Sequence, residues 1–376
     1  MKLTCRRSGG VLVVLVSCLL FPRQALTQMA HPDSSIIPDS VQSEYLFYHG
    51  RPYGSDALLG PLEVLLNKGF AVAQFQNRDR FIFDYNYGGR HVWKSITDLR
   101  GSVQRFGGWN EVLRTEVLPI SFEWKNWKWA PNYIGHVFEG GVTNRKIEEW
   151  YRVHGIPMPG VAAFLTTMTS AVINEMYSHP GVNQGSASTA MDLLLFDPLG
   201  ILLFRHDRVS RFFSKRLGAR IWSGQAGLTP SGELVNNGNN LILKVPLSLI
   251  PGTSFFTRAG LAFTPGFTFH GTNGLDVSFG FGAEGRIQGI DPMTGEEIPQ
   301  LAFGGGVFLD RQGSLLASVL ASEVEHRRLV VNIYPGVIPV LGGRFGTWFI
   351  LRESGALRFG VSARGALGVG LGGGIN

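Results

Sequence analysis

The chain has 376 residues, of which 50 are glycine and only 16% are charged. Glycine usually makes up about 7% of a protein and charged residues about 25%. Both departures favour a membrane β-barrel or another glycine-rich β fold. The formal net charge is +6, but four of these positive charges lie in residues 1–23, which hold no acid, so the remainder carries only +2. The basic charge therefore does not predict nucleic-acid binding.

The N-terminal segment has the three-part layout of a secretory signal: basic residues, an apolar run over residues 11–21, and a region of small residues. We predict a signal peptide at residues 1–27 and an exported mature protein. An alternative is lipoprotein processing, because the four residues that end at Cys18 match the pattern in which this cysteine is lipidated. Cys5 and Cys18 are the only cysteines, so the mature chain is expected to have no disulfide and no cysteine metal site.

The pattern of the sequence changes near residue 210. Residues 28–54 are rich in proline and serine and are predicted to be a tether. Residues 55–208 show helical spacing of apolar side chains and are predicted to form a helical domain. Its expected helices span 58–75, 92–114, 158–177 and 191–204. We expect a break at Gly107 in the second helix and at Pro198 in the last, so the last is not an uninterrupted membrane span of about 20 apolar residues.

After residue 215, short alternating segments separated by turn residues indicate strands. The candidate strands are 219–226, 240–249, 254–263, 266–271, 275–287, 301–309, 315–323, 328–334, 344–352 and 356–372. The last candidate is read as one long strand, because apolar residues alternate with small or polar ones from Leu357 to Leu371. Turns such as Asn273-Gly274 and Gln312-Gly313 predict short hairpin connections.

These patterns together predict an α+β protein. We expect an N-terminal helical domain followed by a C-terminal antiparallel up-and-down β-barrel over residues 215–376. Eight strands are expected after merging short or edge segments, and ten are the alternative, because single-chain bacterial barrels have even strand numbers. A barrel of this size fills its own lumen with side chains or admits only a small ligand.

Five ionisable residues stand out in the helical half: His136, Glu139, Glu175, Asp192 and Asp197. His136 and Glu139 are three residues apart and share one face if their segment is helical. Because ionisable groups in apolar helices are costly to bury without partners, His136, Glu175 and Asp192 are expected to meet. Such a cluster can transfer protons or hold a divalent cation. The alternative, favoured by the lack of a recognised spacing, is a buried network that fixes helix register, so no metal or cofactor is assigned.

The order of these polar positions carries a resemblance. A Gly135-His136 pair, a Glu175 that precedes Tyr-Ser-His-Pro-Gly, and Asp192 with a following Asp197-Pro-Leu-Gly resemble small VanZ-like membrane-helical families. They also resemble exported outer-membrane β-barrel proteins that carry an N-terminal helical segment. The resemblance covers about residues 130–205. It implies that His136, Glu175 and Asp192 are the polar positions of the pattern, and it implies an architecture more than a mechanism.

Two histidines lie in the strand region, His270 and His326. A histidine on a strand can activate a serine nucleophile when an acid and a serine lie nearby. No spacing in the sequence identifies such partners for either histidine, so neither is assigned a role.

We therefore predict a Gram-negative outer-membrane protein with a structural, lipid-organising or small-ligand transport role. Its expected partners are outer-membrane lipid and the barrel assembly machinery, without nucleic acid, and its helical domain is expected in the periplasm. One alternative is an enzyme that modifies envelope lipid or cell wall with the His136, Glu175 and Asp192 cluster. Another is a soluble periplasmic β protein.

Overall fold

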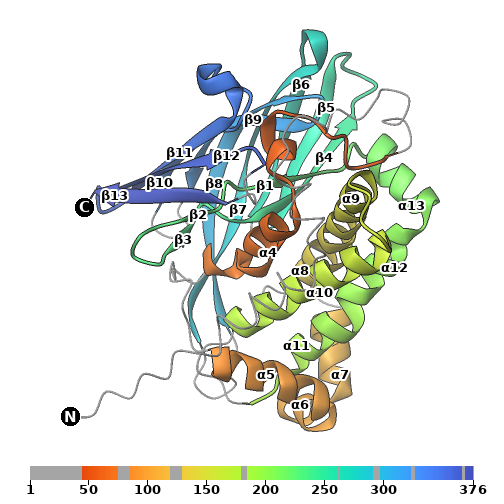
Figure 1. Cartoon of the computed structure of the whole chain (residues 1–376). Coiled ribbons are helices and arrows are strands. Elements are labelled where there is room, and N and C mark those ends of the chain that lie inside the picture. The colour runs from red at the N-terminus through yellow and green to blue at the C-terminus, as the bar shows by residue number, and fades with distance from the viewer. Residues whose placement is uncertain are drawn as a thin grey trace.

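The computed structural model describes residues 45–74, 85–118, 129–178, 184–260, 262–290, 297–322, 327–365 and 369–375. The predicted signal peptide, Cys18 and the predicted tether up to residue 44 lie outside these ranges. Helices come first along the chain and strands follow, which confirms the mixed α+β prediction (Figure 1).

The helical elements run from Gly54 to Arg216, beyond the expected end at residue 208. They are η1 (Gly54–Leu58), α4 (Pro61–Gly69), η2 (Ala71–Gln74), α5 (Tyr85–Thr97), α6 (Leu99–Phe106), α7 (Trp109–Val112), η3 (Leu113–Val117), α8 (Trp129–Pro131), η5 (Asn132–Glu139), α9 (Gly140–Val153), α10 (Pro159–Ser178), α11 (Ala187–Met191), η6 (Asp192–Phe196), α12 (Asp197–Arg205), α13 (Asp207–Arg211) and η7 (Phe212–Arg216). The segments η3, η5, η6 and η7 are π-helical.

Helix boundaries follow from identifiable residues. The Asp98 side chain caps α6 by accepting from the Gly101 N–H at 3.1 Å, and α6 ends at Phe106, directly before Gly107, whose φ is +109°. Glycine adopts this left-handed backbone without a Cβ clash, so the predicted break at Gly107 is confirmed.

The predicted break at Pro198 is wrong. The helix is continuous over Ala187–Arg205 because Pro198 sits in the first turn of α12, directly after the π-helical η6. There the backbone hydrogen bonds change from π-helical to α-helical spacing, and proline, which has no N–H to donate, is accommodated at this change. This stretch is, among the described residues, the one helix long and apolar enough to cross a membrane, and 61% of its most apolar window is buried inside the protein.

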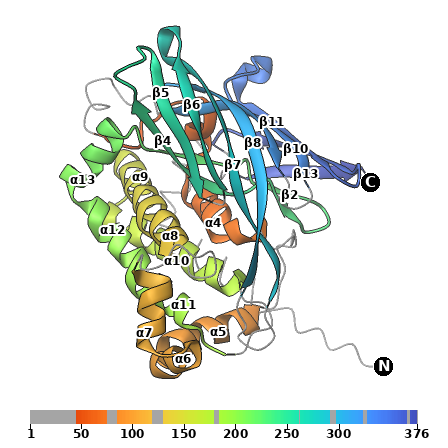
Figure 2. The ribbon, with the colours of Figure 1, turned by 180° about the vertical axis from the view of Figure 1, so that it is seen from behind.

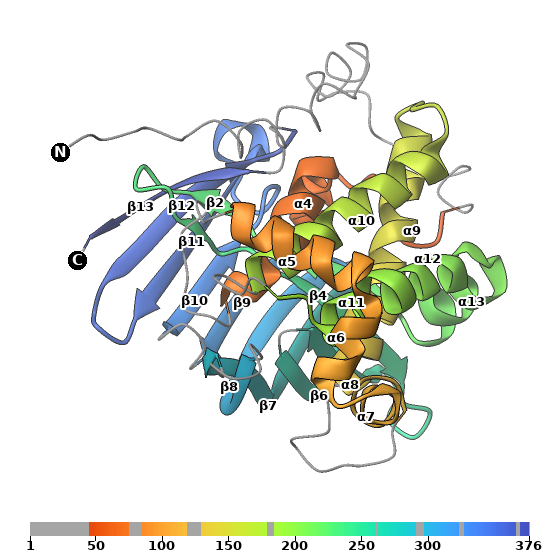
Figure 3. The same ribbon diagram turned by 90° about the horizontal axis from the view of Figure 1, so that it is seen from below.

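Thirteen strands form one sheet in the described part of the chain. They are β1 (Arg220–Ser223), β2 (Gly227–Leu228), β3 (Leu234–Val235), β4 (Asn239–Pro246), β5 (Thr253–Gly260), β6 (Ala262–His270), β7 (Leu275–Ile290), β8 (Glu297–Arg311), β9 (Ser314–Ser322), β10 (Arg327–Ile333), β11 (Phe345–Arg352), β12 (Leu357–Ala363) and β13 (Gly370–Ile375). Seen from below, the strands follow one another along an arc (Figure 3).

The predicted closed barrel of eight or ten strands is wrong. The strand order is β1-β4-β5-β6-β7-β8-β9-β10-β11-β12-β13-β2-β3, so the sheet has two ends, β1 and β3, and is not closed into a barrel. Neighbours are antiparallel except β13 and β2, which pair in parallel at Gly370 and Gly227. The expected meander is present from β4 to β13, where each strand pairs with the next along the chain.

The two faces of the sheet carry opposite residue types. One row of directly paired residues crosses eight strands on the outer face, and we call it the outer row: Phe255, Phe267, Phe279, Val307, Val319, Val331, Phe349 and Phe359. All are exposed except the half-buried Val331. A second row of directly paired residues is offset by one residue along each strand and lies on the inner face, and we call it the inner row. It is buried and mostly polar: Ser254, Thr268, Ser278, Phe308, Ser318, Asn332 and Trp348.

The helices gather on one side of the sheet, as Figures 1 and 2 show. They cover the outer face of β1 and β4, where Leu241 packs in one apolar cluster with Val142 and Phe204. Figure 2 shows strands β5 to β8 with no helix in front of them. On the inner side, Leu58 of η1 packs in a cluster with Trp222 and other residues of the sheet.

The described part of the predicted tether, residues 45–54, is packed rather than loose. Leu46 and Phe47 are each 2% exposed. The backbone N–H groups of Leu46, Phe47 and Tyr48 donate to the buried Glu149 carboxylate at 2.8–3.2 Å. A carboxylate with several N–H donors satisfies backbone groups that would otherwise be buried without partners, so this segment belongs to the folded core.

Candidate functional site

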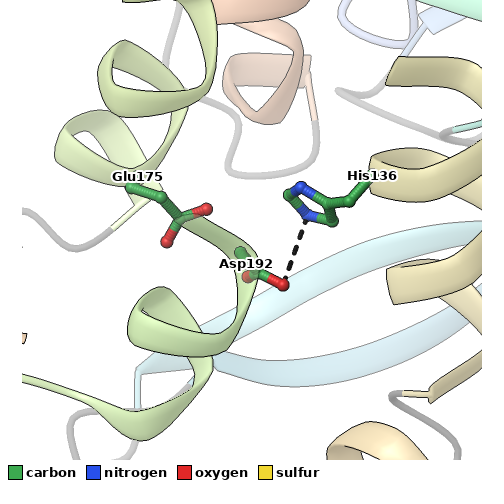
Figure 4. A group of neighbouring side chains, drawn as sticks. All are labelled: His136, Glu175 and Asp192. Atoms are coloured by element: carbon green, nitrogen blue, oxygen red, sulfur yellow. Dashed lines mark ion pairs between the residues drawn. The ribbon is translucent and has the colours of Figure 1, made fainter. Parts of the chain in front are cut away.

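Three of the predicted site residues converge inside the helical part. His136 comes from η5, Glu175 from α10 and Asp192 from η6 (Figure 4). One nitrogen or oxygen atom of each lies within 4.8 Å of the other two. The His136 Nε2 atom lies 3.7 Å from Asp192 Oδ1. We call these three residues the His136 group.

Two π-helical segments present this group. In a π-helix the backbone hydrogen bond spans five residues instead of four, so side chains rotate away from the positions of an α-helix. His136 and Asp192 both lie in such segments. Single π turns within α-helices frequently mark functional sites.

Asp197 holds the imidazole of His136 in place. Its Oδ2 atom lies 3.1 Å from His136 Nδ1, and because an ionised carboxylate only accepts hydrogen bonds, Nδ1 carries the proton. In the neutral imidazole the Nε2 atom then has a free lone pair, and this atom is the one that faces Asp192. A carboxylate behind Nδ1 is the usual way in which proteins orient a histidine that binds a metal through Nε2.

Glu139 lies outside the His136 group, although it is only three residues from His136. Its Oε1 atom accepts from Thr143 at 3.0 Å and from Asn239 at 2.9 Å, and its Oε2 atom lies 3.5 Å from Lys68 Nζ. The segment that carries both residues is π-helical rather than α-helical, and Glu139 has partners of its own outside the group. Glu139 instead joins α9 to strand β4.

Lys68 links Glu139 to the other residues, and the sequence did not single it out. Its Nζ atom lies 3.9 Å from Asp197 Oδ1 and 3.5 Å from Glu139 Oε2. Lys68 is buried on α4, and a buried lysine needs anionic partners. Leu66 and Phe70, two residues before and after it in the sequence, are apolar, and they gave no signal from which the partners of Lys68 could be predicted.

Burial and the neighbouring charges shift the proton affinities in the group. Burial raises the pKa of Glu175 and of Asp192, each with a smaller opposing effect of His136. Burial alone would lower the pKa of His136, but Asp192 and Asp197 outweigh it and raise this pKa to about 10. Thr189 donates to Glu175 Oε2 at 2.7 Å, whereas Asp192 Oδ1 is buried without a hydrogen-bond partner. The group can therefore retain a proton at neutral pH or exchange it for a cation.

The structure shows the surroundings of only one of the two histidines in the strand region, His270 and His326. His326 lies outside the described residues. His270 ends β6 and contacts Ser254 at the start of β5 and Asp276 at the start of β7. Neither partner was identified from the sequence alone. The Asn273-Gly274 turn carried a usable signal, because a hairpin closed by these residues places His270 opposite Asp276.

No protein-family model matches this chain, and no curated protein and no solved structure matches it either.

Proposed function

We propose that this chain is an outer-membrane protein whose β5–β13 outer face contacts lipid. The outer row is the observation that supports this proposal, because it places apolar side chains outside and polar ones inside. A water-soluble sheet has the reverse arrangement. Alternation of apolar outward and polar inward residues is characteristic of membrane strands, and an apolar surface of this extent marks a site of protein or membrane contact.

The inner side of the sheet supports anchoring or lipid organisation over bulk transport. A cavity of about 80 Å³ lies there, lined by residues that include Arg258, Glu284, Asn332 and Tyr334. This volume holds a few water molecules. It does not form a passage for solutes, so the role that fits is to hold the helical part at the membrane.

We propose that the helical part lies at the periplasmic side and touches the lipid boundary. Leu195, Leu199 and Leu202 follow the spacing of one helical stripe and are all more than a third exposed. A helix with an exposed apolar stripe and a buried polar side can lie at a membrane surface. The barrel assembly machinery and outer-membrane lipid are the proposed partners.

The first test is expression of the full-length chain in a Gram-negative host. We expect the protein in outer membranes, and we expect a change of gel mobility in mild detergent when the sample is boiled, because a stable membrane sheet resists detergent until heated. A protein that is recovered from the periplasm without detergent contradicts the proposal.

The outer row gives a sharper test. The double substitution Phe279→Lys and Val307→Lys places two charges on directly paired residues of this row. Each lysine at the membrane midplane costs about 2–4 kcal/mol, so we expect the variant to be lost from the outer membrane. The matched control is Trp93→Lys on α5, a residue that is 68% exposed on the helical part. Equal recovery of the double variant and the control would falsify lipid contact at this row.

A second candidate function is supported by the His136 group. Its converging donors, with Asp197 behind the histidine, suit a divalent cation such as Zn²⁺ or an acid–base pair in an enzyme that modifies envelope lipid or cell wall. His136, Glu175 and Asp192 would hold the ion, which would supply a Lewis acid, and Asp197 would orient His136.

Metal content tests this second candidate without an activity assay. The purified protein is incubated with Zn²⁺, dialysed and analysed by elemental mass spectrometry. We expect about one equivalent of Zn²⁺ in the unmodified chain and loss of it in Asp192→Asn. Glu139→Gln is the control, because Glu139 lies in the same segment but outside the group. A folded, unmodified chain without Zn²⁺, together with unfolding of His136→Ala, would leave the group as a structural network.

A further inference from the structure

Three side chains at adjacent ends of strands β5, β6 and β7 have the geometry of a nucleophile, a base and an acid. The Ser254 Oγ atom lies 2.7 Å from His270 Nε2, and His270 Nδ1 lies 3.0 Å from Asp276 Oδ1. The Asp276 carboxylate accepts the Nδ1 proton, so Nε2 accepts the proton of the Ser254 hydroxyl. We call these residues the rim triad. The His136 group is separate from it and shares no residue with it.

The register of three neighbouring strands creates this arrangement. His270 and Asp276 are directly paired between β6 and β7. Ser254 pairs with Thr268 between β5 and β6, and His270 follows Thr268 by two residues, so it lies on the same face and diagonal to Ser254. Diagonal neighbours on adjacent strands are within reach of long side chains. The contacts therefore follow from backbone pairing rather than from one flexible loop.

Lys244 holds the acid of the rim triad. Its Nζ atom lies 3.1 Å from Asp276 Oδ2, the carboxylate oxygen that does not face His270, and it also contacts Asp310. Asp310 is in turn held by the Gly313 N–H at 3.0 Å. Each oxygen of the Asp276 carboxylate thus has its own partner. An acid fixed in this way keeps the histidine in the tautomer that leaves Nε2 free to accept a proton.

Exposed apolar side chains lie next to the rim triad, on the neighbouring turn and at the end of β6, whereas Lys244 and Asp310 border it on the inner side. The turn over residues 247–252 precedes Ser254, and its Gly252 carbonyl accepts from the His270 N–H at 2.8 Å. In this turn Leu249 is 92% exposed and Ile250 is 52% exposed. Phe269 precedes His270 in the sequence, lies on the outer face of the sheet and is 51% exposed. Exposed apolar side chains on one side of a polar reactive centre match a substrate that joins an acyl chain to a polar ester group.

We propose that Ser254, His270 and Asp276 form a serine-esterase site that cleaves the acyl ester of a membrane lipid. The choice of lipid as substrate rests on the proposed lipid contact of the sheet, whereas the triad itself does not. Ser254 is 1% exposed while the His270 side chain is 39% exposed. The acyl chain therefore reaches Ser254 when the 247–252 turn, which borders it, moves aside at the lipid surface.

The reaction is a two-step acyl transfer. The Ser254 Oγ atom attacks the ester carbonyl carbon, and its proton moves to His270 Nε2. The carbon–oxygen bond of the ester breaks, the alcohol leaves with the proton from His270, and the acyl group stays on Ser254. Water then attacks this acyl ester with His270 as base, which releases a fatty acid and restores the Ser254 hydroxyl. Asp276 remains ionised and holds the imidazole.

The test uses covalent labelling of the full-length protein in detergent with a biotinylated fluorophosphonate. This reagent reacts with activated serines and needs no knowledge of the substrate. We expect labelling of the unmodified chain at Ser254, located by peptide mass spectrometry, and no labelling of Ser254→Ala. We expect Asp276→Asn to react at least about 100-fold more slowly, because loss of the acid costs up to about 10⁴-fold in a working triad.

Ser278→Ala is the matched control. Ser278 is also a buried serine of the inner row, but its hydroxyl contacts Thr268 at 2.7 Å and not the histidine. The control should label at the rate of the unmodified chain. Equal heat stability of all variants shows that a loss of label is not a loss of fold. A folded, unmodified chain that does not label, or a Ser254→Ala variant that labels equally, overturns the triad.

Fatty-acid release from phosphatidylethanolamine vesicles then tests the substrate class. Release by the unmodified chain and not by Ser254→Ala supports a lipid ester. Labelling at Ser254 with cleavage of p-nitrophenyl acetate but not of the vesicle lipid overturns the lipid assignment and keeps the esterase. The labelling experiment uses protein from whichever cell fraction contains it. A failure of the proposed membrane location therefore does not change the labelling result, and the two proposals are tested independently.

Discussion

Glu63 is a buried acid on α4 that lies outside the His136 group and the rim triad. It is 1% exposed, and Asn67 donates to its Oε1 atom at 2.9 Å. Burial raises the pKa of Glu63 to about 7, although hydrogen bonds from Ser223 and Asn67 and the charge of Lys146 act in the opposite direction. In the unfolded chain the pKa returns to about 4.3. The folded state therefore binds this proton more tightly than the unfolded state.

The pH dependence follows from this difference. Stability contributed by protonated Glu63 is present below about pH 4 and is lost as the pH rises to about 7. The loss is on the order of 4 kcal/mol. We expect Glu63→Gln to have nearly the same thermal stability as the unmodified chain at pH 4 and a higher one at pH 8, measured by thermal denaturation in detergent. Glu353→Gln, at an exposed residue that follows β11, is the control, and its difference from the unmodified chain should be the same at both pH values. If the difference in thermal stability between Glu63→Gln and the unmodified chain does not change with pH, the raised pKa of Glu63 is contradicted.

The candidate site was partly predictable at the level of single residues. His136, Glu175 and Asp192 stood out because each interrupts an apolar stretch, where an ionisable group needs a partner. The cost of burying them without partners predicted that these three residues meet. The roles of Lys68 and of Ser254 could not be predicted, because a buried lysine and a strand serine acquire a role only through residues far away in the chain.

At the scale of elements, two glycines set how closely α9 and α12 approach. A Cβ at Gly141 would lie 2.6 Å from the Gly200 carbonyl oxygen, and a Cβ at Gly200 would lie 2.5 Å from the Val137 carbonyl oxygen. Real Cβ atoms do not come this close to backbone oxygen, so only glycine allows this spacing. The spacing matters for the site, because α12 begins with Asp197, which orients His136.

This close approach leads to a prediction at Gly200. We expect Gly200→Ala to lower the free energy of unfolding by about 1–3 kcal/mol, because the added methyl group forces the helices apart. Gly135→Ala is the control. Gly135 lies next to His136, a Cβ there meets nothing within 4 Å, and alanine favours helix over glycine by up to about 1 kcal/mol. Thermal denaturation of both variants provides the comparison, and equal destabilisation would count against packing as the cause.

Strand boundaries show where periodicity alone fails. The alternation from Leu357 to Leu371 predicted one strand, but β12 ends at Ala363 and β13 begins at Gly370. The chain turns at Gly365, whose φ of +74° requires glycine. The apolar residues on the two sides of the turn remain in phase, so the pattern continues through a break in the structure. In contrast, the hairpins at Asn273-Gly274 and Gln312-Gly313 were predictable because their residues adopt positive φ.

At the scale of the whole molecule, the order of helices before strands was predictable, because local periodicity reports element type. Strand number and closure were not. Two of the thirteen strands, β2 and β3, have only two residues each, too few to give a period. The parallel pairing of β13 with β2 joins segments far apart in the sequence, and no local pattern reports such a contact. The burial of residues 45–48 against Glu149 is another long-range contact of this kind.

The pairing of β13 with β2 also has a consequence for biosynthesis. Gly227 lies in the second strand along the chain, whereas its partner Gly370 lies in the last strand and is made after all the others. Until residues 370–375 have been synthesised, β2 has backbone N–H and C=O groups without this partner strand, and such an edge can pair with other chains. Contacts between distant segments form slowly. Without β13 this edge of β2 stays open, and a chain cut short before β13 is expected to aggregate instead of folding.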